Sequence, residues 1–138
     1  MSDGLSVVVH VDGGSRGNPG PSAVAAVATD SQGELLMEAS EYIGETTNNV
    51  AEYRAVQLGA RIAKELGADT LEVVNDSELI ARQISGAYKV KNAGLRPLWV
   101  ETMQALREFP QWSVRNVRRE QNERADELVN IELDRVLG

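Results

Sequence analysis

Four acidic residues stand at matching places in the elements that the sequence predicts. Asp12 and Asp76 each follow a predicted strand. Glu52 and Asp126 lie in the first turns of predicted helices, and such helix starts share one ligand-binding edge of an α/β sheet with the strand ends. Four carboxylates at one edge repel one another unless cations neutralise them, and oxygen-only ligands favour Mg²⁺ or Mn²⁺. Two such ions about 4 Å apart can support an in-line phosphoryl displacement.

Each of these carboxylates also has a purely structural interpretation. The spacing from Asn49 to Glu52 fits a capping box, and Asp76 could be the N-cap of the next helix. Asp126 could favour the positive end of a helix dipole, and Asp12 could be a turn residue. The structural interpretation is weakest for Asp12, because a buried-type strand ends there on a charge beside glycines that permit a close approach.

The hydrophobic pattern predicts the elements that must position these carboxylates. Alternating and helical spacings predict strands at 6–11, 23–29, 34–43, 71–75 and 112–117, helices at 50–66, 77–85 and 95–108, and a last helix capped by Asn122. Asn49 is the expected N-cap of the long helix. The opening meander implies antiparallel strands, and strands separated by helices imply parallel ones. The sequence therefore predicts an α/β fold, a mixed five-stranded sheet with helices on both faces.

Composition excludes several classes of protein. The chain has 138 residues, no cysteine, one histidine and a net charge of −7. Its length suits a single domain, 1–138, and its residue counts exclude cysteine-based zinc sites, cysteine nucleophiles and disulfide scaffolds. No apolar run approaches the ~18 residues of a membrane span, and the first residues do not resemble a signal peptide. We therefore expect a cytoplasmic protein, a monomer, with no membrane partner.

Four motifs carry a resemblance to a known family. Residues 11–20, 47–53, 75–79 and 122–128 read VDGGSRGNPG, TNNVAEY, NDSEL and NERADEL. In this order and spacing they resemble the four motifs of type 1 ribonuclease H. The resemblance runs through nearly the whole chain, and it implies the ribonuclease H-like fold, a mixed five-stranded sheet with flanking helices.

The resemblance also implies an activity and its residues. Members cleave the RNA strand of RNA–DNA hybrids, so the hybrid is the expected partner. The four carboxylates match the catalytic ligands of two Mg²⁺ ions, for which Mn²⁺ can substitute, in a two-metal-ion hydrolysis that leaves 5′-phosphate and 3′-hydroxyl ends. In that scheme Asp12 bridges both ions, with Glu52 and Asp76 near the bridge, and Asp126 helps to hold the ion that activates water. The positions expected to bind substrate are Gly13, Ser15, Asn18, Thr47, Asn48, Asn49 and Arg119.

The chain departs from the better-known bacterial members in three places. The loop before the fourth carboxylate has no histidine, and Arg119 is the candidate for its role, although a guanidinium cannot shuttle protons. The basic protrusion between the third and fourth motifs is reduced to residues 87–94. Glu78 stands where many members have glutamine, so that substrate contact is not carried over.

Charge is unevenly distributed along the chain. Residues 85–124 hold eight basic and four acidic side chains, a net charge of +4, which leaves −11 for the rest. A basic edge facing phosphates is therefore compatible with the acidic total. Two alternatives stay open: a catalytically silent nucleic-acid-binding module on the same fold, and a metal-dependent nuclease or phosphatase with another substrate. The chain is also compatible with being one domain of a larger, fused protein.

Overall fold

The computed structural model describes residues 4–138. Its helices and strands follow the predicted order, with one short 3-10 helix, η1, added. The elements are β1 (Leu5–Ser15), β2 (Gly20–Thr29), β3 (Leu35–Thr46), α1 (Asn48–Glu65), β4 (Ala68–Asn75), α2 (Glu78–Ser85), α3 (Arg96–Leu106), β5 (Gln111–Asn116), η1 (Arg119–Gln121) and α4 (Glu123–Leu137).

The five strands form one mixed sheet, as the sequence predicts. Their order across the sheet is β3-β2-β1-β4-β5. The first three strands pair in antiparallel fashion, whereas β4 pairs in parallel with both β1 and β5. Strand β1 is therefore central, and it joins the antiparallel half of the sheet to the parallel half.

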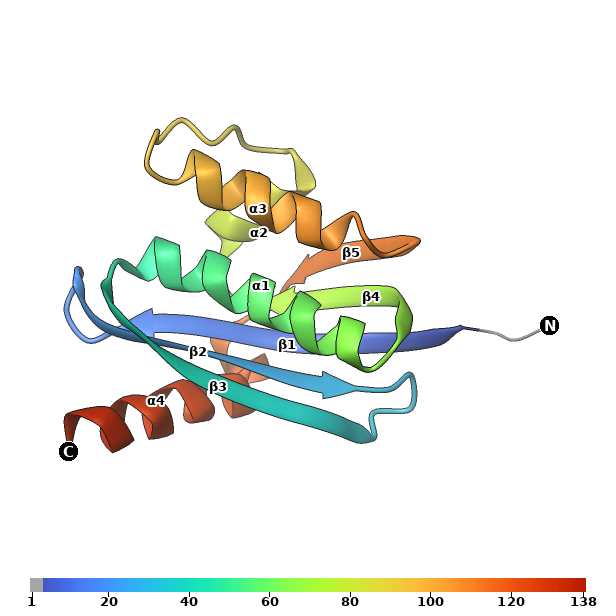
Figure 1. The fold of residues 1–138 in the computed structure, drawn as a ribbon, viewed down its shortest axis with the longest axis horizontal. Coiled ribbons are helices and arrows are strands. Elements are labelled where there is room, and N and C mark those ends of the chain that lie inside the picture. The colour runs from blue at the N-terminus through green and yellow to red at the C-terminus, as the bar shows by residue number, and fades with distance from the viewer. Residues whose placement is uncertain (1–3) are drawn as a thin grey trace.

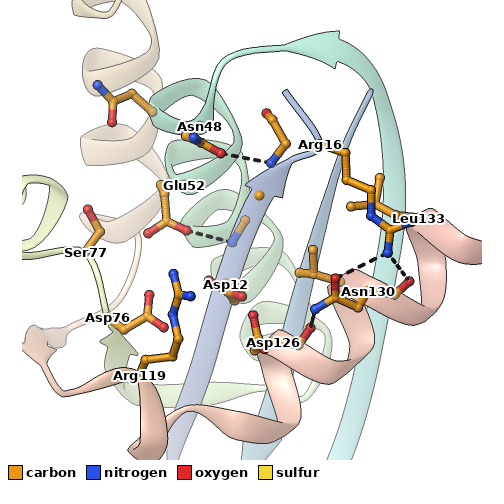
Figure 2. A pocket seen from close by; sticks show the side chains of 15 residues that line it. Asp12, Arg16, Asn48, Glu52, Asp76, Ser77, Arg119, Asp126, Asn130 and Leu133 are labelled. Atoms are coloured by element: carbon orange, nitrogen blue, oxygen red, sulfur yellow. Dashed lines mark hydrogen bonds between the residues drawn. The ribbon is translucent and has the colours of Figure 1, made fainter. Parts of the chain in front are cut away.

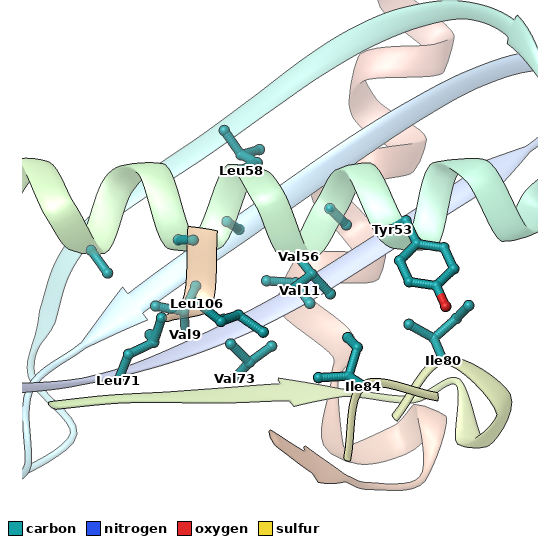
Figure 3. Packing of buried hydrophobic residues seen from close by; sticks show 14 of the residues in the cluster. Val9, Val11, Tyr53, Val56, Leu58, Leu71, Val73, Ile80, Ile84 and Leu106 are labelled. Atoms are coloured by element: carbon teal, nitrogen blue, oxygen red, sulfur yellow. The ribbon is translucent and has the colours of Figure 1, made fainter. Parts of the chain in front are cut away.

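Helices cover both faces of this sheet. Helix α1 lies along one face with α2 and α3 beyond it, and α4 lies alone on the other face (Figure 1). Val9 and Val11 of β1 point toward α1 and pack in the larger core (Figure 3). On the opposite face, a smaller core joins β2 to α4 through Ala23, Ala25, Val129 and Leu133. No helix within residues 4–138 is both long enough and apolar enough to cross a bilayer.

Strand β1 is longer than the sequence predicts. It runs to Ser15 rather than ending at Val11, because β2 continues to pair with it as far as Ser22. Its parallel pairing with β4 ends earlier, at His10. Asp12 therefore lies inside a strand, on a stretch where only one side is paired, and the interpretation of Asp12 as a turn residue is wrong.

Candidate active site

The four carboxylates converge where β1 extends beyond β4. Asp76 comes directly after the last residue of β4, and Asp12 lies two residues beyond the last β1–β4 pair. Glu52 approaches from α1, and Asp126 from the first turn of α4 (Figure 2). All four line one open pocket of about 580 Å³ at this edge of the sheet.

Three of the carboxylates form a compact cluster. One oxygen from each of Asp12, Glu52 and Asp76 lies within 4.8 Å of the others. Asp12 and Glu52 are only 7% and 8% exposed, and Asp76 is half-buried. Asp126 is half-buried and lines the same pocket, and its charge contributes to raising the pKa of Asp12. The predicted convergence of the four residues is therefore observed, with three forming the compact cluster.

Glu52 is held by β1 and does not cap its helix. Its Oε1 accepts a hydrogen bond of 2.7 Å from the backbone N–H of Gly13. The N-cap of α1 is Thr47, whose side chain accepts from Val50 N at 3.3 Å, so the prediction of Asn49 as the cap is wrong. Because α1 begins at Asn48, Glu52 lies beyond its first turn, and the interpretation of Glu52 as part of a capping box is wrong.

The glycine at position 13 allows this contact. A Cβ built on Gly13 would lie 2.2 Å from the carbonyl oxygen of Ala51, closer than any real contact. Only glycine lets the first turns of α1 pack this tightly on β1. Gly13 is also one of the positions expected to bind substrate, and its backbone N–H is engaged with Glu52.

Of the structural interpretations of Asp76 and Asp126, the first is wrong and the second agrees with the structure. The N-cap of α2 is Ser77, whose hydroxyl accepts from Ile80 N at 3.4 Å, so Asp76 is not a helix cap. Asp126 does lie in the first turn of α4, where the helix dipole favours a negative charge. Its place in the pocket is compatible with a favourable interaction with the helix dipole and with a role as a metal ligand.

Burial and mutual repulsion disfavour negative charge in this cluster. Desolvation, followed by the charges of Glu52, Asp76 and Asp126, raises the pKa of Asp12 far above its ordinary value. Burial also raises the pKa of Glu52, against the lowering effect of the Gly13 hydrogen bond. The pKa of Asp76 is raised by burial as well, although Arg119 opposes the shift. A bound divalent cation would relieve all three effects.

The donor set fits a hard divalent cation. The clustered ligands are carboxylate oxygens only, as Mg²⁺ and Mn²⁺ prefer. Two arginines also line the pocket, but Arg16 is already paired with Asp134 at 2.8 Å. Arg119 alone leaves the four carboxylates with an excess of negative charge, so the pocket is suited to cations.

Arg119, and not Arg118, faces the carboxylates. Arg119 lines the pocket from η1, and its side chain lies close to Asp76 (Figure 2). Its charge lowers the pKa of both Glu52 and Asp76. Arg118 is 83% exposed at its side chain and lies 3.9 Å from Glu120. The geometry therefore agrees with the choice of Arg119.

Most of the other predicted substrate positions form a connected rim. Ser15 N donates to Asn48 Oδ1 at 2.9 Å, and Asn48 N donates to Asn18 Oδ1 at 3.0 Å. These bonds join the β1–β2 loop to the start of α1. Thr47 and Asn49 line, together with Asn18, a second hollow of about 390 Å³ beside the first pocket.

Several residues at the site do not stand out in the sequence. Arg16 crosses to α4, where it contacts Asn130 Oδ1 at 3.3 Å, and both line the pocket. Asn92, from the loop before α3, lines the second hollow. Asn122 was expected to cap α4, but its side chain makes no cap bond. Of these four residues, Arg16 and Asn122 lie within the motifs, but the sequence pattern does not identify either as a site residue.

Comparisons with known proteins agree with this site. A sequence profile of the family described as "Reverse transcriptase-like" matches residues 10–131. The chain is similar to "Ribonuclease HI" of Halobacterium salinarum, with 40% identity over 131 residues, 95% of this chain and 66% of the relative. A "Bifunctional protein" of Mycobacterium tuberculosis is 41% identical over 131 residues, which are 94% of this chain and 36% of the relative. The chain thus spans less than two thirds of these relatives' length.

A solved structure extends the similarity to three dimensions. LC11-RNase H1 in complex with an RNA/DNA hybrid superposes with a TM-score of 0.91 at 42% identity, covering 96% of this chain and 100% of that one. The fold and the carboxylate site define a ribonuclease H-like protein. More narrowly, the chain belongs to the type 1 ribonuclease H family, a family of hydrolytic enzymes, and the resemblance of its four motifs is confirmed.

Proposed function

We propose that this protein is a metal-dependent endonuclease that hydrolyses the RNA strand of RNA–DNA hybrids. The observation that carries the proposal is the cluster of Asp12, Glu52 and Asp76 within 4.8 Å, on the wall of an open pocket. A pure binding module has no reason to keep an uncompensated group of anions where phosphates must approach. The hybrid bound to LC11-RNase H1 supports the same substrate here.

The ligand set for the metal would be the four carboxylates of the pocket. When bound, a pair of Mg²⁺ ions supplies an activated water and stabilises the departing 3′ oxygen, which leaves 5′-phosphate and 3′-hydroxyl ends. Asp12 is central to the set, because the charges of the other three all act on it. Glu52 is held in place by Gly13 N–H, so its carboxylate is oriented before any ligand arrives.

The remaining residues position the substrate. Arg119 places a permanent positive charge beside the carboxylates, where it can hold a phosphate oxygen. The hydrogen-bonded rim of Ser15, Asn18 and Asn48, with Thr47 and Asn49 in the adjacent hollow, offers hydroxyl and amide groups. Such groups suit 2′-hydroxyl and backbone contacts in a minor groove, which identify an RNA strand without reading its sequence.

The test is a comparison of substrates labelled on one strand. We expect the protein to cut the RNA strand of a hybrid in Mg²⁺, and to leave duplex RNA, duplex DNA and the DNA strand of the hybrid intact. Removal of Mg²⁺ by a chelator should abolish cleavage. Equal cleavage of duplex DNA would indicate another nuclease, and hybrid binding without cleavage would indicate a silent binding module.

A further inference from the structure

Asn122 is a buried amide that does not perform its expected role. It is 1% exposed and occupies the N-cap position of α4, yet its side chain makes no hydrogen bond to that helix. Its Nδ2 instead donates to the carbonyl oxygen of Val11, at 2.8 Å. Val11 immediately precedes Asp12, so this bond joins the start of α4 to β1 directly beside a proposed ligand.

The same amide also acts on a second carboxylate. Asn122 contributes to lowering the pKa of Asp76, against the effect of burial. The amide nitrogen carries two hydrogens. One of them donates to the carbonyl oxygen of Val11, which joins the start of α4 to β1.

The backbone of Asn122 connects two more parts of the site. Its carbonyl oxygen accepts from Asp126 N at 3.2 Å, one turn into α4. Its N–H donates to the carbonyl oxygen of Arg119 at 2.9 Å, at the start of η1. Asn122 is thus hydrogen-bonded to the backbone of Asp126, of Arg119 and of Val11, the residue before Asp12.

The side chain of Asn122 has a buried oxygen that does not stabilise the fold. Its Oδ1 is buried and has no hydrogen-bond partner among the residues of 4–138. An unsatisfied buried oxygen destabilises the fold. The amide nitrogen, by contrast, donates to β1, at the carbonyl oxygen of Val11. Asparagine at this position is therefore explained by its donors and not by helix capping.

We propose that Asn122 is a positioning residue for the metal site. It sets the spacing of Asp12 and Asp126 through hydrogen bonds to the backbone of β1 and of α4, and it contacts neither the metal nor the substrate. The proposal rests on the proposed function, because it concerns the same carboxylates. Groups that orient ligands in this way are known to influence metal affinity strongly.

The test uses Asn122→Ala and two controls. Gln111→Ala removes an exposed amide at the start of β5, which accepts from Thr70 Oγ1 at 3.4 Å and does not line the pocket, so it should leave Mg²⁺ binding unchanged. Leu106→Ala opens a cavity in the core under α3, away from the site, and so lowers stability alone. Each protein is measured for thermal unfolding without metal, for the Mg²⁺ dissociation constant by NMR titration, and for kcat and KM on a hybrid.

We expect Asn122→Ala to weaken Mg²⁺ binding and to lower kcat by about 10–100-fold, with KM for the hybrid unchanged. Leu106→Ala should lower the unfolding temperature and leave the Mg²⁺ dissociation constant as it is. If Asn122→Ala folds too poorly to measure, Asn122→Ser keeps one donor and should give a smaller shift of the same sign. An unchanged Mg²⁺ dissociation constant in the folded Asn122 variants would overturn the proposal. A wild-type protein that neither binds Mg²⁺ nor cleaves hybrid would overturn the proposed function instead.

Discussion

Asp12 is the carboxylate on which the site depends most. It is almost fully buried, and the charges of Glu52, Asp76 and Asp126 all act on it. Asp12→Asn keeps the size of the side chain and removes the charge that a metal needs. We expect cleavage of a hybrid to fall by several orders of magnitude while hybrid binding survives. Near wild-type cleavage by this variant in Mg²⁺ would remove Asp12 from the catalytic set.

The same residue predicts how stability without metal depends on pH. The pKa of Asp12 is raised in the folded protein, first by burial and then by its neighbours, so the folded state binds a proton more tightly than the unfolded chain. Its contribution is favourable below about pH 4, the unfolded pKa, and is lost as pH rises through the folded pKa.

Chemical denaturation in a chelator, from about pH 5 to pH 9, measures this dependence. The free energy of unfolding should decline toward the alkaline end for the wild type and decline less for Asp12→Asn. At about pH 8 the variant should be more stable by about 1–3 kcal/mol, since each unit of pKa shift corresponds to about 1.4 kcal/mol. Parallel curves for the two proteins would contradict the raised pKa.

Arg119 and Arg118 form a matched pair for the loop before α4. Arg119 faces the carboxylates, whereas Arg118 points into solvent. We expect Arg119→Ala to lower kcat/KM by about 10–100-fold, the worth of one charge-assisted hydrogen bond. It should also reduce the log–log salt slope of hybrid binding by about one unit, with Mg²⁺ binding intact. Arg118→Ala should change neither value, and the reverse result would place the role at Arg118.

At the scale of elements, the packing of α1 on β1 orients Glu52. The contact is made at Gly13, where a side chain would collide with the backbone of Ala51. Gly13→Ala should therefore push the start of α1 away from β1, weaken the bond to Glu52 and destabilise the fold by about 1–3 kcal/mol.

Gly14→Ala is the matched control for this contact. A Cβ at Gly14 would meet only Val129 Cγ1, at an ordinary distance of 3.6 Å. Denaturant unfolding of both variants should show a clear loss of stability for Gly13→Ala and little change for Gly14→Ala. Equal effects on stability would contradict the close approach of α1 to β1 at Gly13.

The sequence predicts the elements well and their ends less well. The periodic patterns identify all five strands and all four α-helices, because each element buries one face with a regular spacing. Strand β1 continues past its apolar stretch to Ser15 because the backbone of β2 remains available as a partner. Thr47 takes the cap position that was expected at Asn49, since both residue types can cap a helix.

Part of the candidate site can likewise be predicted from the sequence, and part of it cannot. Carboxylates at strand ends and helix starts are predictable because topology brings those ends to one edge. The bond from Gly13 to Glu52 and the donors of Asn122 depend on packing between elements far apart in sequence, which spacing does not reveal. The side-chain directions of Arg118 and Arg119 likewise follow from η1, a turn that the sequence pattern does not indicate.

At the scale of the whole molecule, ion pairs neutralise part of the basic segment 85–124. Three of its eight basic residues, Arg115, Arg118 and Arg124, lie within 4.0 Å of acidic groups. Within residues 4–138, the five basic residues of this segment without such a partner are Lys89, Lys91, Arg96, Arg107 and Arg119. Few cations are thus available for phosphates on a protein of net charge −7.

We therefore expect modest, salt-sensitive binding of hybrid by this chain alone. Each phosphate contact contributes about 0.9 to the log–log salt slope, and few contacts are available. Fusion to a basic, hybrid-binding module should raise turnover through effective concentration. Titration of hybrid against Asp12→Asn, from low to physiological salt, measures the binding. Tight binding that hardly changes over that range would show that other contacts hold the substrate.

The central claim is that Asp12, Glu52, Asp76 and Asp126 form a divalent-metal site. Anomalous diffraction from crystals of the protein soaked in Mn²⁺ tests it most directly, because the signal locates the ion without any assay. We predict that the strongest anomalous peak lies among the oxygens of Asp12, Glu52 and Asp76, and that it disappears in Asp12→Asn. An empty cluster in crystals that bind Mn²⁺ elsewhere would contradict the account.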